Sequence, residues 1–312
     1  MPRLFFATDI HGSDICWKKF LASAAYYEAD LLVLGGDLTG KAIVPLVLED
    51  GKARATLLGS AYELEGEGAM LDFEKQVMSR GYYPVRMSVA ERDAFLADHA
   101  LLDSRFRQAV LETLERWLKL AEERLPKGVR CFVCPGNDDP FEVDALFAAS
   151  GRVEDGEGKA LDLGQGFSLY STGWSNRTPW HTHREEDEDD LAARIARFAP
   201  PGLDYSRAIF NFHCPPRASG LDDAPELGED LSIKNAGQST VPVGSSAVRA
   251  ALEDRRPLLG LHGHIHEAKG IARVKKTLAV NPGSLYEQGV LQGALFDLDP
   301  KKGIRSYVLT TG

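Results

Sequence analysis

The sequence predicts an α/β fold in which two mixed β-sheets pack face to face between outer helices, as a four-layer α/β/β/α sandwich with a two-metal site at the strand ends. Apolar, strand-like runs alternate with helix-like segments, beginning with a strand–helix–strand unit over residues 4–34. Five strand-like runs also end in metal-binding side chains, which fall in Asp9-Ile10-His11, Gly36-Asp37, Gly136-Asn137-Asp138, Phe212-His213 and Gly263-His264-Ile265-His266.

The opening unit has clear signals for each element. Residues 4–7 and 31–34 are apolar runs of strand length. Between them Ser13 can cap a helix. Helical spacing places four apolar residues on one face of that helix, which we expect to be buried: Trp17, Phe20, Leu21 and Ala24.

We expect residues 1–312 to form a single domain that carries an inserted elaboration at about residues 42–126. Asp50-Gly51 is a strong hairpin signal near its start. Two or more helices follow, and the last has apolar residues at helical spacing up to a stop near Pro126. The insertion either shapes access to the strand ends or covers the sheet as an extra layer.

The second half continues the alternation. Thr182 and Glu185 have the spacing of a capping box for a helix that buries Leu191 and Ile195. Ser245 or Ser246 can cap a further helix. The remaining expected elements are a helix at 140–149, strands at 167–171, 209–212 and 258–261, and strands of a second sheet at 277–280, 290–296 and 304–309.

Charge and hydropathy exclude some functions. The formal net charge is −10 and the isoelectric point is about 5.4, which argues against nonspecific nucleic-acid binding because that needs basic surfaces for the phosphates. The longest apolar runs fall short of the roughly 20 residues of a membrane helix. The apolar start is also too short for a signal peptide. We therefore expect a cytoplasmic protein without a membrane partner.

The chain has four cysteines, two of which form a C-x-x-C at Cys131 and Cys134. This spacing can indicate zinc or redox chemistry. Here it lies in a predicted strand, where residues i and i+3 face opposite sides. We therefore interpret the pair as buried small hydrophobic residues. Reduced thiols, including the isolated Cys16 and Cys214, fit a cytosolic enzyme.

The five motifs offer carboxylate, amide and imidazole ligands, which suit divalent first-row metals. On an extended segment, residues i and i+2 point to the same side, so Asp9 with His11 and His264 with His266 could each grip a cation. Asp37 has two carboxylate oxygens and could bridge two cations. Each single motif could instead be a turn, because Asp, Asn and Gly are common after strands. The five together favour a metal site.

As an ordered set, these motifs resemble those of the calcineurin-like metallophosphoesterase superfamily, over the chain from Phe5 to at least Ser284. The resemblance implies that one metal is held by Asp9, His11 and His266, that the other is held by Asn137, His213 and His264, and that Asp37 bridges them. The chain departs from the pattern at Asp138, where many members have a histidine. The identity of the group that protonates the leaving alcohol is therefore open.

The resemblance implies a dimetal-dependent phosphoester hydrolase, with two divalent cations as cofactors: Mn²⁺ first, or Fe, Zn, Ni or Co. We expect Asp138, His213 and His264 to contribute to catalysis. The favoured substrate is a small phosphodiester. The alternatives are a phosphomonoesterase acting on a nucleotide or a phosphoprotein, and a non-catalytic interaction module on the same fold.

An irregular segment after the predicted strand at 167–171 is the candidate for substrate contact. It carries Trp174, Asn176, Arg177 and Trp180. Arg177 could pair with a phosphate and a tryptophan could stack on a ring. The alternative is that both tryptophans only cover the edge of the sheet. A long polar loop at 220–243 is a second candidate.

Three further histidines are weaker candidates. His181 and His183 form another H-x-H, which falls in a predicted surface turn and is expected to lie away from metal. His262 either orients a metal ligand or is a core histidine with its hydrogen bonds satisfied.

Overall fold

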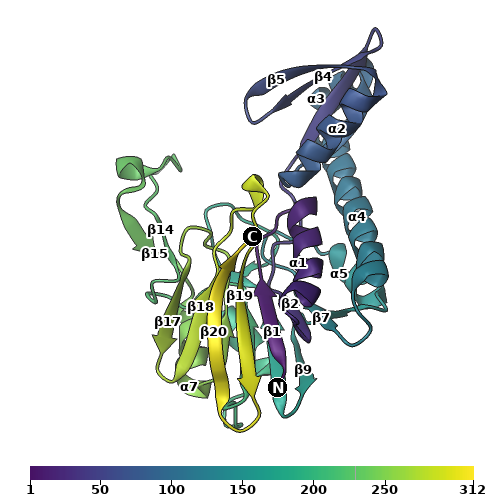
Figure 1. The fold of residues 1–312 in the computed structure, drawn as a ribbon. Coiled ribbons are helices and arrows are strands. Elements are labelled where there is room, and N and C mark those ends of the chain that lie inside the picture. The colour runs from purple at the N-terminus through teal and green to yellow at the C-terminus, as the bar shows by residue number, and fades with distance from the viewer. Residues whose placement is uncertain (229) are drawn as a thin grey trace.

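The computed structural model describes residues 1–228 and 230–312, and two six-stranded mixed sheets form its centre (Figure 1). The first sheet has the order β20-β19-β1-β2-β7-β8. Strands β1, β2, β7 and β8 run parallel to one another. Strand β19 is antiparallel to both of its neighbours, β1 and β20. Their bounds are β1 Arg3–Ala7, β2 Leu31–Leu34, β7 Arg130–Val133, β8 Val153–Asp155, β19 Gln292–Asp299 and β20 Gly303–Thr311.

The second sheet has the order β17-β18-β16-β13-β10-β9. Its four central strands are parallel and its two edge strands are antiparallel to their neighbours. The bounds are β9 Lys159–Gly164, β10 Phe167–Thr172, β13 Ala208–Phe212, β16 Leu259–Leu261, β17 Gly270–Val274 and β18 Thr277–Asn281.

Three apolar clusters give the layers. One cluster lies between the sheets and joins Phe6 and Phe132 of the first sheet to Ile209 and Leu261 of the second. A second cluster covers the outer face of the first sheet with α1, α4 and α5. A third covers the second sheet with α6 and α7. The predicted α/β/β/α arrangement is therefore observed, with helices α1 Asp14–Tyr26, α4 His99–Arg124, α5 Val143–Ala149, α6 Glu188–Phe198 and α7 Ser246–Arg255.

Residues 43–97 form a separate four-stranded sheet with its own small core. In Figure 1 it stands above the main sheets, at one end of the long helix α4. The hairpin at Asp50-Gly51 is present as the turn between β3 and β4. The elements are β3 Ile43–Glu49, β4 Lys52–Leu57, β5 Ser60–Glu65, β6 Tyr83–Ser88, α2 Gly66–Ser79 and α3 Val89–Ala97.

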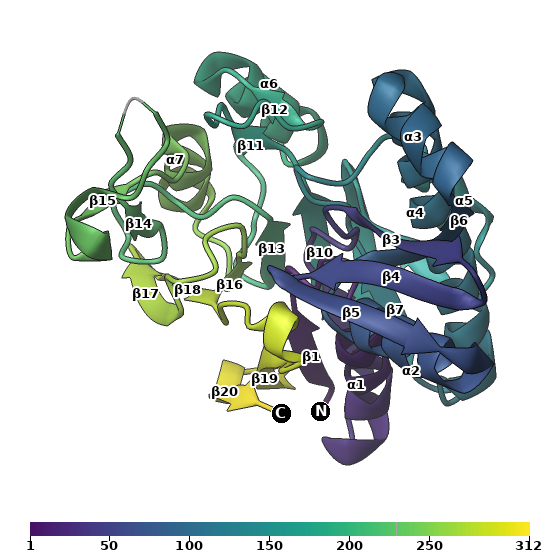
Figure 2. The same ribbon diagram turned by 90° about the horizontal axis from the view of Figure 1, so that it is seen from above.

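Smaller elements surround the upper edge of the main sheets. Seen from above in Figure 2, the β14–β15 hairpin, α6 and the four-stranded sheet stand around the ends of the central strands. The small elements are β11 Ser175–Asn176, β12 Glu185–Glu186, β14 Asp223–Pro225, β15 Thr240–Pro242, and two 3-10 turns, η1 Lys234–Gly237 and η2 Tyr286–Gln288. The long polar loop at 220–243 thus contains a short hairpin.

Helix caps were predicted well in two cases and wrongly in one. Ser13 caps α1 and Ser245 caps α7, each accepting a backbone hydrogen bond. The capping box at Thr182 and Glu185 is wrong, because α6 begins at Glu188 with Asp187 as its cap. Thr182 and Glu185 do bond to each other, but they close a turn instead.

The assignment of the last strands was also partly wrong. Only β18 belongs to the second sheet, whereas β19 and β20 join the first. Strand β19 pairs with β1 in the register Phe5↔Leu295. The apolar alternation of a strand indicates that one face is buried but does not identify its neighbour, which explains the error.

All four cysteines are free and buried. Burial raises the pKa of Cys131 to about 12, and Cys134 donates to Glu157 at 3.4 Å. These contacts agree with the interpretation of both as packed thiols. Within the described residues, no helix is long and apolar enough to span a membrane.

Candidate metal centre

The seven predicted metal ligands lie together where strands of both sheets end. Each follows the carboxyl end of a parallel strand, and these ends meet at one edge of the sandwich. Asp9 and His11 follow β1, Asp37 follows β2, Asn137 follows β7, His213 follows β13, and His264 and His266 follow β16.

Among the described residues, candidate ligand atoms form three groups, and the atoms of each group lie within 4.8 Å of one another. Two groups consist of predicted ligands: Asp9 with His11 and His266, and Asp37 with His213 and His264. The third group joins His11 and Asp37 to Asp138. Asp37 Oδ2 also lies 3.6 Å from His11 Nε2 and 3.3 Å from His213 Nε2, so it reaches both groups of predicted ligands. This division agrees with the resemblance. It differs from the i, i+2 argument for His264 and His266, which fall in different groups.

The backbone at the ligands is turned rather than extended. Positive φ angles occur at Asp9 (53°), His11 (35°), Asp37 (51°) and His264 (67°). Asp9 and His11 therefore meet through a left-handed turn, which corrects the expectation that they project from an extended segment. Such angles strain a residue with a Cβ and are retained at functional sites when the surroundings hold them in place.

The glycines directly before Asn137 and His264 are needed for close packing. A Cβ on Gly136 would lie 2.1 Å from Asp37 Oδ1, and a Cβ on Gly263 would lie 2.2 Å from Asp9 Oδ2. Real atoms do not approach this closely, so these positions accept only glycine without a shift of the ligand.

One buried ligand atom needs a partner that protein groups do not supply. Among the described residues, the side-chain oxygen of Asn137 is buried without a hydrogen-bond partner. A buried acceptor without a partner is costly, and a cation at this point would satisfy it. The ring of His213 lies between two oxygens, because Nδ1 is 3.0 Å from the Gly35 carbonyl oxygen and Nε2 is 3.3 Å from Asp37 Oδ2.

The pKa values reflect a cluster of opposite charges. Burial disfavours ionisation of Asp9, but His213 and His266 outweigh it and lower its pKa to about 2. Burial likewise opposes protonation of His213, yet Asp37 and Asp9 raise its pKa to about 10. Burial lowers the pKa of His264 to about 4. The carboxylates are thus ionised, as metal ligands must be.

Asp138 lies beside this cluster with a different environment. Burial and the neighbouring Asp37 raise its pKa to about 7. Its Oδ2 lies 3.5 Å from Lys41 Nζ and 3.9 Å from His11 Nδ1. Lys41 was not singled out in the sequence, where nothing marks it apart from its position directly after the Gly36–Gly40 motif.

Asp139, which was missed as a functional group, and the turn at 281–284 support the ligands. The buried carboxylate of Asp139 accepts from the backbone of Gly136, Leu38 and Thr39, so it ties the Asp37 and Asn137 loops together. Ser284 donates to the Asp9 carbonyl, and Asn281 donates to the carbonyls flanking His264. The second of two consecutive acidic residues after the ligand Asn137 is the sequence signal that could have pointed to Asp139.

The predicted substrate segment borders the centre, but its four residues differ. Trp174 packs against the Arg194 guanidinium, whose central carbon lies 3.7 Å from the centroid of the indole ring. Asn176 donates to the Val243 carbonyl. Arg177 and Trp180 are exposed, and Arg177 pairs with Asp187 at 3.0 Å. Trp174 and Asn176 are thus engaged in packing, whereas Arg177 and Trp180 face solvent.

His181 and His183 are exposed, as expected of a surface segment. His262 is buried, and its Nδ1 lies 2.7 Å from the Phe212 carbonyl oxygen, next to the candidate ligand His213. Its Nε2 has no hydrogen-bond partner among the described residues, so it is not a core histidine with both ring nitrogens satisfied.

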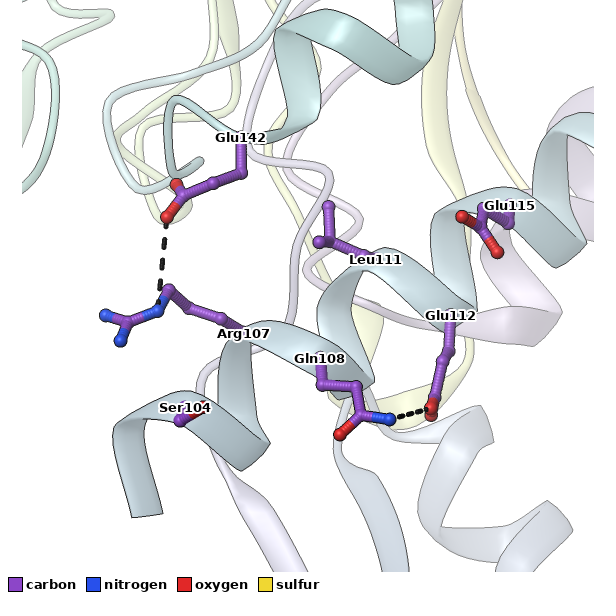
Figure 3. Close-up of a pocket in the computed structure, with 7 residues that line it drawn as sticks. All are labelled: Ser104, Arg107, Gln108, Leu111, Glu112, Glu115 and Glu142. Atoms are coloured by element: carbon purple, nitrogen blue, oxygen red, sulfur yellow. Dashed lines mark hydrogen bonds and ion pairs between the residues drawn. The ribbon is translucent and has the colours of Figure 1, made fainter. Parts of the chain in front are cut away.

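A shallow hollow elsewhere on the surface is unrelated to the ligands. It lies along α4 beside the start of α5, and Arg107 reaches across it to Glu142 at 4.0 Å (Figure 3). Its lining is mostly charged and contains none of the seven predicted ligands.

Comparison with known proteins adds evidence on the fold. No family model matches the sequence. The uncharacterized protein MJ1162 of Methanocaldococcus jannaschii is 26% identical over 167 residues, which are 53% of this chain and 67% of that protein. Thus only about half of the present chain is covered by this sequence match.

Solved structures match over the whole chain. One crystal structure is 17% identical, covers 99% of both chains and has a TM-score of 0.60. TT1561 of Thermus thermophilus is 14% identical, covers 100% of this chain and 98% of its own, and has a TM-score of 0.50. YfcE, a phosphoesterase from E. coli, also matches over 98% of both chains, at 14% identity and a TM-score of 0.33. The first two show that the fold is shared by other proteins.

Proposed function

We propose that this chain is a dimetal-dependent phosphoester hydrolase of the calcineurin-like metallophosphoesterase type. The observation that carries the proposal is the meeting of seven ligand residues from five strand ends, with Asp37 reaching both groups. The buried side-chain oxygen of Asn137, which has no partner among the described residues, supports it. A non-catalytic module would not need to keep such strained and unsatisfied groups.

The protein groups have separate tasks in this proposal. Asp9, His11 and His266 would hold one cation, Asn137, His213 and His264 the other, and Asp37 would contact both. Bound cations of this kind supply Lewis acidity and an activated water at neutral pH. The chain contributes a buried setting in which ligand charges are fixed in advance, so little reorganisation is needed during hydrolysis.

Asp138 would orient a ligand or a water rather than donate a proton. In the protein alone, its pKa of about 7 would allow donation, because burial and Asp37 favour the neutral form. Two cations next to it would favour the ionised form again. Its contact with Lys41 acts in the same direction. The leaving group would then be protonated by another group or by water.

A small phosphodiester is the first substrate class, and a phosphomonoester is the second. The second class has one observation in its favour. The Lys41 ammonium lies half-exposed beside Asp138 and could balance the additional negative charge of a monoester. Arg177 and Trp180 are the exposed residues of the neighbouring segment that could contact the organic group. Mn²⁺ is the proposed cation.

We also propose that residues 42–126 elaborate a single domain rather than form a second one. Helix α4 belongs to the main core, where Trp117 stacks on Trp17 at 5.2 Å with an interplanar angle of 7°. Asp14 accepts from the Trp117 indole at 2.6 Å. One thermal unfolding transition is expected, and two well-separated transitions would contradict the proposal.

The function is tested with a panel of aryl and alkyl phosphomonoesters and phosphodiesters, assayed after removal of metal and again with Mn²⁺, Ni²⁺ or Zn²⁺ added. We expect activity that depends on the added metal and is highest on a diester. A monoester preference would select the second substrate class. Metal-independent activity, or binding of fewer than two cations per chain by elemental analysis, would refute the dimetal hydrolase.

A further inference from the structure

We infer that Thr182 and Glu185 are positioning residues that turn the side-chain oxygen of Asn137 toward the metal centre. The inference rests on the proposed function, because it concerns the same site. The side chain of Asn137 ends in a carboxamide, whose oxygen and NH₂ group are similar in size. Only the oxygen can ligate a cation, so the orientation of the amide must be set by its other neighbours.

The neighbours of Asn137 determine that orientation through one hydroxyl group. Asn137 Nδ2 lies 2.8 Å from Thr182 Oγ1, and Thr182 Oγ1 lies 2.6 Å from Glu185 Oε1. A hydroxyl has one proton, and here it is directed to the carboxylate. Thr182 Oγ1 can therefore only accept from Asn137, and the group that faces it must be the NH₂.

Glu185 is suited to hold that proton direction. Glu185 is 5% exposed. Its carboxylate also accepts hydrogen bonds from Thr178 Oγ1, Thr178 N and Thr182 N. Burial opposes ionisation, but these hydrogen bonds from Thr178 and Thr182 lower the pKa of Glu185. An ionised carboxylate only accepts, so the sequence of donors runs from Asn137 through Thr182 to Glu185.

The consequence is visible at the other end of the amide. With Nδ2 engaged by Thr182, Asn137 Oδ1 is left buried and without a partner among the described residues. The backbone supports the same geometry, because Arg184 N donates to the Asn137 carbonyl and Arg184 Nε donates to the Asp139 carbonyl. The segment 182–185 thus clamps the Asn137 loop and links it to the proposed substrate segment.

The experiment measures Mn²⁺ binding to metal-free protein by isothermal titration calorimetry. Thr182→Val keeps the shape of the side chain and removes the hydroxyl, Thr182→Ser keeps the hydroxyl, and Thr178→Val removes a hydroxyl from the same network that does not touch Asn137. We expect Thr182→Val to weaken one of the two binding events by about 10–100-fold, the usual effect of losing a group that orients a ligand. Thr182→Ser and Thr178→Val should bind like the unmodified protein.

Several outcomes would overturn the inference. Two unchanged binding events in Thr182→Val would do so, as would equal weakening by Thr182→Ser or by Thr178→Val. Thermal unfolding of the metal-free variants shows whether each is folded, and Thr182→Ala replaces the valine variant if that one is not. Unmodified protein that binds no Mn²⁺ would overturn the proposed function and this inference together, whereas two intact sites in a folded Thr182→Val variant would overturn the inference alone.

Discussion

The ligand edge and the neighbouring segment 174–180 lie side by side but are held in different ways. At the edge, Asp9 and His213 are 1% and 0% exposed, and a Cβ on Gly136 or Gly263 would lie within 2.2 Å of a ligand carboxylate. In the segment, Trp180 is 63% exposed, and Arg177 forms an ion pair with the likewise exposed Asp187. We propose that the ligand edge carries out the chemistry and that the exposed residues of segment 174–180 contact the substrate.

The largest effect is expected for Asp37→Asn. Asn is nearly isosteric but lacks the charge that both ligand groups share, so activity should fall by about 10³-fold or more while the fold remains. Turnover on the best substrate and the thermal unfolding of the metal-free protein check the two halves of the prediction. Retention of more than a tenth of the activity would mean that Asp37 does not contact both cations.

Asp138→Asn should come next, with a loss of about 10–100-fold. If Asp138 orients a ligand or a water, alkyl and aryl esters should slow alike, because neither reaction then needs its proton. The comparison of an alkyl with an aryl ester checks this directly. A loss confined to the alkyl ester would show that Asp138 is the acid, since a poor leaving group depends on protonation.

Gly136→Ala tests whether the edge is as tightly packed as described. The new methyl group would meet the Asp37 carboxylate at 2.1 Å, so the variant should lose about 1–3 kcal/mol of stability and bind metal more weakly. Gly151→Ala is the matched control, because a Cβ there meets no atom within 4 Å. Chemical denaturation of both metal-free variants gives the measurement. Equal stability of the two would contradict the argument.

The smallest effect is expected for Arg177→Ala in the exposed segment. Since Arg177 is exposed and its ion pair is on the surface, stability should change by less than about 0.5 kcal/mol. KM should rise by about tenfold with kcat little changed, if Arg177 binds substrate equally in the ground and transition states. A fall in kcat as large as the fall in kcat/KM would instead show that Arg177 takes part in the chemical step, which would contradict the proposed difference between the two regions.

The clustering of the candidate ligands could be predicted because its signals are local in the sequence. Each candidate lies in the loop that follows an apolar strand, and the carboxyl ends of parallel strands meet at one edge whichever strands pair. The glycines next to Asp37, Asn137 and His264 are explained by distances in the structure. The turned backbone at Asp9 and His11 was not foreseen, because the spacing of two ligands does not distinguish an extended segment from a left-handed turn.

The missed features depend on contacts between distant residues. Asp139 holds the Asp37 loop across about a hundred residues of sequence, and Thr182 reaches Asn137 across 45. The order of strands in the sheets is of the same kind, and β19 was therefore placed in the wrong sheet. A pattern of residue types identifies what each segment can do, but the pairing of segments follows from the packing of the whole chain.

The pairing of β1 with β19 has a consequence for how the protein is made. On the ribosome, β1 is made well before the strand that covers one side of it, since some 285 residues separate Ala7 from Gln292. At about 5–20 residues per second, that interval lasts from roughly a quarter of a minute to a minute. For most of this interval the ligand set is incomplete, because its last member, His266, follows β16. Metal loading is therefore expected only after His266 has been synthesised, and the edge of β1 stays open to other chains until β19 pairs with it.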